Sequence, residues 1–160
     1  MIGTHIMPYS QEVEGVVGLN YNFEPLGARV ARNEDTSRVF SSTVHGDPAT
    51  PLLEAVSGDP VRIHVLVPFS EQAHVFTLEG HPWPVEPGRE GSDVLSAVQI
   101  GALEAITIQP QGGAGGRTGL PGDYLYGHHR EPYRQAGLWG IFRVLPSEEA
   151  EGWLRPLPGR

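Results

Sequence analysis

The chain has 160 residues, a formal net charge of −8, 21 glycines, 15 prolines and no cysteine. Its length fits one domain with a single core, because chains of about 150 residues bury about 70% of their unfolded surface. The acidic balance argues against nucleic-acid partners, no apolar run approaches the ~20 residues that span a bilayer, and the lack of cysteine excludes disulfides, thiolate nucleophiles and sulfur-rich metal sites.

Residues 1–38 sustain neither a strand period nor a helix period, and we interpret them as an N-terminal arm of extended segments that includes one strand. The opening MIGTHIMPYS lacks the basic start and apolar centre of a secretory signal. Metal cations and basic proteins are the partners that the negative charge favours.

Period-2 patterns begin at Val39. RVFSSTVHG (38–46) is predicted as a strand, followed by turns at DPATP and VSGDP. In VRIHVLVPF (61–69) the apolar residues at 61, 63, 65 and 67 share one face, which is typical of a half-buried strand. In AHVFTLEGH (73–81) the side chains of His74, Phe76 and Leu78 are expected on one face, opposite those of 75, 77 and 79.

Two further strands are predicted in SDVLSAVQI (92–100) and LEAITIQP (103–110), and QGGAGGRTGLPG (111–122) is predicted as an irregular loop. This loop lacks the Gly-Lys-Ser/Thr of a phosphate loop. YLYG (124–127) and LWGIFRVL (138–145) are the last predicted strands, and the tail 147–160 has room for one helical turn. Seven or eight short strands joined by Gly, Pro and Asp turns indicate an antiparallel β-sandwich or barrel.

The ordered segments AHVFTLEGH, PGDYLYGHH and AGLWGIFRV resemble the cupredoxin domain that closes multicopper oxidases. The resemblance covers residues 39–146 and is closest to the manganese-oxidase-like branch, through VHGDPATP, GGAGG and PGDYLY. It implies an all-β, cupredoxin-like Greek-key sandwich or barrel of seven to eight strands, with residues 1–38 and 147–160 outside it. It also implies an extracytoplasmic protein.

The resemblance also assigns family ligand positions to residues of this chain, including the position where the family has a cysteine that binds copper. The family's first segment reads His-Pro-x-His-x-His-Gly-His, so His74 takes the blue-copper position, while Thr77 and Glu79 replace two histidines of the trinuclear cluster and His81 is the final, non-ligating histidine. The second segment reads His-Cys-His.

In that second segment Gly127 takes the first cluster position, His128 the cysteine position and His129 the second cluster histidine. Tyr133 replaces the other blue-copper imidazole, and Leu138 is an ordinary axial residue.

A blue copper site needs a copper–thiolate bond, which the imidazole of His128 does not supply. We expect at most a type 2 copper or a zinc ion held by His74 and His128, with Tyr133 as an oxygen ligand or hydrogen-bond partner. His129 and Glu79 would need ligands from another subunit or domain. In the alternative interpretation the domain has lost its metal, His74 and His128 bond backbone carbonyls, and Glu79 and His129 form an exposed charge-assisted hydrogen bond.

The remaining histidines have structural interpretations. His81 is expected to pack beside Trp83 and fix a turn, His45 to orient Asp47 or cap a turn, and His64 to lie on the surface. His5 lies in the arm. Four aromatic residues with strand parity are expected to pack in the core: Tyr124, Tyr126, Trp139 and Phe142.

Two functions remain open. The leading one is a degenerate multicopper-oxidase-type cupredoxin domain, a structural or interaction module that binds one type 2 copper through histidine and contacts other cupredoxin domains or subunits. The alternative is a self-contained copper or zinc metalloenzyme, an oxidoreductase with an open coordination position. The chain lacks the blue-copper and trinuclear ligand sets, and no Gly-x-Ser-x-Gly or His-Glu-x-x-His motif marks another catalytic centre.

Overall fold

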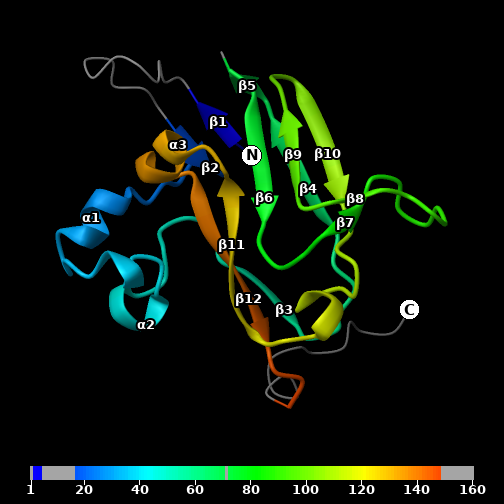
Figure 1. Ribbon diagram of the computed structural model, residues 1–160. Coiled ribbons are helices and arrows are strands. Elements are labelled where there is room, and N and C mark those ends of the chain that lie inside the picture. Colours follow the sequence, from blue (N-terminus) through cyan, green and yellow to red (C-terminus); the bar gives the residue numbers. More distant parts are fainter. Residues whose placement is uncertain (1, 5–16, 71, 149–160) are drawn as a thin grey trace, which may run out of the picture.

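The computed structural model describes residues 2–4, 17–70 and 72–148 (Figure 1). In this part of the chain seven strands have four residues or more, which confirms an all-β fold with the predicted number of principal strands. These seven are β3 (Leu53–Val56), β4 (Ile63–Val67), β6 (His74–Leu78), β9 (Ala97–Ile100), β10 (Glu104–Ile108), β11 (Gly122–His128) and β12 (Trp139–Leu145).

The shorter elements complete the described chain. The remaining strands are β1 (Ile2–Thr4), β2 (Val17–Leu19), β5 (Phe69–Ser70), β7 (Trp83–Pro84) and β8 (Val94–Leu95). The helices are α1 (Leu26–Val30), α2 (Ser42–His45) and α3 (Glu131–Ala136), with single 3₁₀ turns at Thr36–Arg38 and Gly116–Thr118. The three α-helices gather at one side of the strands (Figure 1). None of the helices in the described ranges has the length and apolar character that crossing a membrane requires.

The main sheet has five strands in the order β3-β12-β11-β6-β9. β12, β11, β6 and β9 pair antiparallel, as expected, but β3 pairs parallel to β12, with Leu53 opposite Phe142. The prediction that all strands pair antiparallel is therefore wrong. The direction of a strand leaves no trace in its alternation pattern, and the long chain between β3 and β12 allows the crossover that a parallel pair needs.

A second layer is formed by the antiparallel pair β4 and β10. The alternation in 61–69 is confirmed, because Val65 and Val67 are buried while His64 and Leu66 are exposed. Val65 and Val67 join buried side chains from the main sheet in one hydrophobic core, which includes Phe76, Leu78 and Phe142. Tyr126, Trp139 and Phe142 are buried as predicted, and Tyr124 packs against the core partly buried.

The predicted strand over 38–46 is wrong. A 3₁₀ turn ends at Arg38 and α2 covers Ser42–His45. The side chain of Asp35 accepts a hydrogen bond from the Ser37 N–H, which stabilises the first turn. In a run rich in Ser, Thr and Asp such local bonds compete with sheet pairing, and this is why its β-branched residues do not form a strand.

The structure also differs from the predicted extended arm. Leu19 belongs to the core cluster, and α1 presents Arg29, whose side chain is fully buried. Arg29 pairs with Glu24 at 3.1 Å, donates to the carbonyls of Val39 and Gly46, and lies over the ring of Trp139 at 4.8 Å. One buried cation therefore ties residues 24–46 to strand β12.

Candidate functional site

His74, His128 and Tyr133 meet at one end of the main sheet. His74 begins β6 and His128 ends β11, and the antiparallel register sets Phe76 opposite His128, so both histidines lie at the same end and on the same face. The ring centroids of His74 and His128 are 4.8 Å apart. Tyr133, from α3, stacks on His128 with centroids 4.5 Å apart and an angle of 21° between the planes. The three side chains are at most 1% exposed.

Helix α3 was not predicted, although the sequence carries both of its end signals. Pro132 lies in the first turn, where the missing amide proton costs no hydrogen bond, and Gly137 ends the helix with a left-handed φ of 115°. The helix has only six residues, too few for a hydrophobic period to be recognised. It is nevertheless the element that brings Tyr133 onto His128.

Hydrogen bonds fix the orientation of each ring. Nδ1 of His128 accepts the backbone N–H of Arg130 at 2.9 Å. Nε2 of His74 lies 2.8 Å from Oγ of Ser70, whose hydroxyl donates to the carbonyl of Gln72, so His74 is the donor to Ser70. The Tyr133 hydroxyl donates to Oε1 of Gln72 at 2.8 Å. The predicted alternative, histidine bonds to backbone carbonyls, is therefore wrong in its details, because the partners are an amide and a hydroxyl.

The surroundings of the cluster favour uncharged rings. Burial, together with the positive charge of Arg130, lowers the pKa of His74 to about 4. Burial lowers the pKa of His128 to about 3, with further contributions from His74 and from Arg130 and Arg134. Burial raises the pKa of the Tyr133 phenol. At neutral pH the cluster therefore holds two neutral imidazoles and a protonated phenol.

This arrangement does not fit a copper or zinc ion. Such ions take three or four ligands with free lone pairs. Nδ1 of His128 accepts an N–H, its Nε2 carries the proton of the neutral ring, and Tyr133 donates to Gln72. Within the described residues no group of three or more His, Asp or Glu is placed to hold a metal. The guanidinium of Arg130, 5.1 Å from the centroid of the Tyr133 ring, adds a charge that repels cations.

Glu79 and His129 lie on the other face of the β6–β11 pair, and both are exposed. The Glu79 N–H donates to the carbonyl of Leu125, and the His129 N–H donates to that of Val75. They are thus four residues apart along the pair, a separation of about 13 Å at ~3.3 Å per residue. Glu79 faces Arg134 at 4.0 Å instead, and the expected bond between Glu79 and His129 is absent from the described structure.

Gly127, which takes the place of a cluster histidine in the resemblance, has no room for any side chain. Its φ is 134°, and a Cβ atom built on it would lie 2.5 Å from the carbonyl oxygen of Leu138. The same carbonyl accepts the N–H of His128 at 2.9 Å. The backbone of β11 therefore approaches Leu138 so closely that only glycine fits.

His81 has the structural role that was predicted, with different neighbours. Its Nδ1–H donates to the carbonyl of Glu79 at 2.8 Å, and its Nε2 accepts the Gly115 N–H at 2.9 Å. The ring packs edge-on against Tyr124 and Phe142, not against Trp83 as expected. His81 therefore fixes both its own turn and the glycine-rich loop, a role that no local pattern signals.

The other histidines are accounted for in the same way. His64 is exposed, as predicted, with Nδ1 2.8 Å from Oγ1 of Thr107. Asp47 pairs with Arg143 at 2.7 Å, and no hydrogen bond from His45 to Asp47 is found in the described residues. His5 lies outside the described residues.

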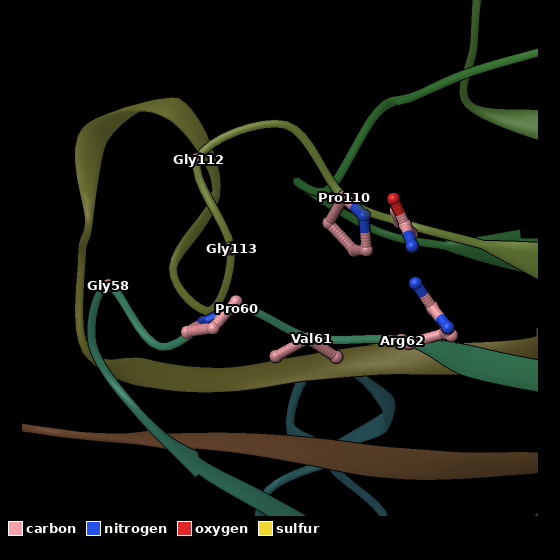
Figure 2. A pocket seen from close by; sticks show the side chains of 8 residues that line it. Gly58, Pro60, Val61, Arg62, Pro110, Gly112 and Gly113 are labelled. Carbon is pink, nitrogen blue, oxygen red and sulfur yellow. The ribbon is translucent and has the colours of Figure 1, made fainter. Parts of the chain in front are cut away.

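A separate pocket of about 690 Å³ lies between the start of β4 and the loop after β10 (Figure 2). Its walls are Pro60, Val61 and Arg62 on one side and Pro110 with glycines of the loop on the other. Arg62, whose guanidinium lies beside the side-chain amide of Gln109, is the one charged residue among the described residues of its lining. The pocket therefore lacks an acid–base pair or a nucleophile and does not reach the histidine cluster.

No family model matches the chain, and no curated protein sequence matches it. Among solved structures it is similar to the McoA multicopper oxidase from the hyperthermophile Aquifex aeolicus (TM-score 0.50, 15% identity) and to its 2F4 variant (TM-score 0.51, 14% identity), covering 89% of this chain and 28% of each oxidase. A Campylobacter jejuni multicopper oxidase described as a metallo-oxidase aligns with TM-score 0.45 and 15% identity, over 57% of this chain and 20% of that enzyme.

These likenesses show the fold: the chain is an all-β, cupredoxin-like domain, and its structural neighbours are copper proteins. It spans about a quarter of the length of the Aquifex oxidase.

Proposed function

We propose that this chain is a structural or interaction module, a degenerate cupredoxin-like domain that does not retain a metal ion at His74 and His128. One observation carries the proposal: the two imidazoles and the Tyr133 phenol are buried, packed against one another and hydrogen-bonded within the protein. A packed cluster of neutral groups stabilises the sandwich by excluding water, whereas a metal centre needs lone pairs directed at one point.

The predicted type 2 copper is the specific alternative to test. Purified protein is loaded with Cu(II), dialysed, and analysed for copper and zinc per chain, alongside His74→Ala and His128→Ala. We expect far less than one tightly held ion per chain, with no difference between the wild type and the two variants. His64→Ala, which removes an exposed imidazole, controls for surface binding.

The proposal would be overturned if the wild type held about one copper ion per chain, with a type 2 signal in electron paramagnetic resonance, and if both His74→Ala and His128→Ala lost that ion. That result would favour the self-contained copper or zinc oxidoreductase. Neither arrangement allows a blue site, because the chain has no thiolate.

The contact face of the module is proposed to be the side of the β6–β11 pair that carries the exposed residues Glu79 and His129. Together with Arg134 from α3, this side presents an anion, a cation and an imidazole. Other cupredoxin-like domains or subunits, including a second copy, are the proposed partners, since the chain has about a quarter of the length of the oxidase it resembles in fold.

Sedimentation velocity over a range of protein concentrations tests self-association at this face. Association that weakens in Glu79→Arg but not in Glu104→Arg, an exposed acidic residue on β10, would support it. A monomer at all concentrations would remove the second copy from the candidate partners.

A further inference from the structure

The backbone amide of Arg130 is placed to control what His128 can bind. It lies 2.9 Å from Nδ1 of His128, two residues earlier in the chain, and no other acceptor for this amide is found in the described structure. Arg130 precedes α3 with φ −72° and ψ 123°, so the start of the helix holds the amide in place. The ring it meets is 1% exposed, stacks on Tyr133 and meets the His74 ring edge-on.

A neutral imidazole has one N–H and one lone pair. Because Nδ1 of His128 accepts from Arg130, the proton resides on Nε2, and the ring has no second lone pair to offer a metal. Binding through Nε2 would move the proton to Nδ1, where two N–H groups would face each other at 2.9 Å. Binding through Nδ1 would displace the amide, leaving a buried N–H without a partner.

We infer that the backbone N–H of Arg130 is a specificity-determining group that keeps His128 from acting as a metal ligand. The inference rests on the proposed metal-free function and gives the reason why His128 does not bind a metal. The tautomer that the Arg130 amide imposes on the His128 ring prevents metal binding, and the distance from His74 does not.

The buried Nε2 of His128 has no hydrogen-bond partner within the described residues, which agrees with a ring whose orientation is set from the other nitrogen. Turning the ring by 180° would keep its plane against Tyr133 but would give up the Arg130 bond at Nδ1.

Replacing residue 130 by the α-hydroxy acid of alanine turns this amide into an ester and removes the one N–H without adding an atom in front of Nδ1 of His128. The carbonyl of residue 130, which accepts from Tyr133 and Arg134, is kept. Arg130→Ala is the matched control, because both variants lose the guanidinium and its bond to Gln72, while only the alanine variant keeps the amide proton.

The test is the affinity for Cu(II), measured by titration with a competing chelator for the wild type, the ester variant at position 130 and Arg130→Ala. We expect the ester variant to bind at least tenfold more tightly than Arg130→Ala, and to lose that gain when His74→Ala is added. Equal affinities in the two variants would overturn the inference and leave the proposed function standing. Tight copper binding by the wild type at His74 and His128 would overturn the proposed function itself.

A second measurement does not depend on the folding of the ester variant. Long-range ¹H–¹⁵N spectra of the wild-type histidine rings at neutral pH report the tautomer directly. We expect His128 with its proton on Nε2, and in Arg130→Ala the same tautomer. A proton on Nδ1 of His128 in the wild type would overturn the inference whatever the variants do.

Discussion

Mild acidification tests the buried histidine cluster most directly. The pKa of His74 is lowered from 6.5 to about 4, and that of His128 from 6.5 to about 3, in both cases first by burial. The unfolded chain takes up these protons near pH 6.5, while the folded chain does not. The stability from both neutral rings is therefore fully present above pH 6.5 and is lost as the pH falls below it.

The size of the effect follows from linkage. Each histidine contributes a slope of about 1.4 kcal/mol per pH unit, so the pair contributes about 2.8. Between pH 7.5 and 5 the free energy of unfolding should fall by about 4 kcal/mol, a large part of the 5–15 kcal/mol typical of a domain. His81, whose pKa burial also lowers, acts in the same direction. The carboxyl pKa values of Asp35 and Asp47 are lowered, so these groups change the stability only at a lower pH than the histidines do.

The assay is urea unfolding at pH values from 7.5 to 5, in the presence of a metal chelator. In His128→Phe, which keeps an aromatic ring against Tyr133, the slope should decrease by about 1.4 kcal/mol per pH unit. His64→Gln removes an exposed imidazole and should leave the slope unchanged. A stability that is flat from pH 6.5 to 5, or an equal slope in His128→Phe, would refute the burial of neutral rings.

Three substitutions test the fold around the site by urea unfolding at pH 7. Arg29→Ala should cost about 3–5 kcal/mol, because it removes a buried cation and leaves the half-buried carboxylate of Glu24 without its ion pair and two carbonyls without this donor. Arg89→Ala, which breaks an exposed ion pair, should cost less than about 1 kcal/mol. His81→Phe keeps the ring but loses both of its hydrogen bonds, and should cost about 2–4 kcal/mol; no loss would mean that these bonds do not hold the glycine-rich loop. Gly127→Ala combines a left-handed φ with a backbone clash and should cost about 2–5 kcal/mol, whereas Gly88→Ala, with open space, should show the conformational strain alone, about 1–2; equal costs would contradict the close approach of β11 to its neighbour.

The sequence alone was sufficient for the inward face of the sandwich. The alternation over 61–67 and 74–78 marks one face of each strand as apolar, and the core uses that face. The absence of cysteine determines that no thiolate site exists. The resemblance predicted that His74, His128 and Tyr133 are neighbours. In the structure the register of β6 and β11 and the position of α3 bring their ring centroids within 5.7 Å of one another.

Other features required the tertiary structure. Pairing of β3 parallel to β12, burial of Arg29 over Trp139 and the contact of His81 with Gly115 join residues far apart in the chain, and local patterns carry no signal for such contacts. The chemistry of the cluster was decided in the same way. A histidine at position 128 offers a lone pair or a proton according to the group that meets its Nδ1, and the fold sets an amide proton there. The residue type therefore permits metal binding, while the packed backbone around it determines which nitrogen carries the proton.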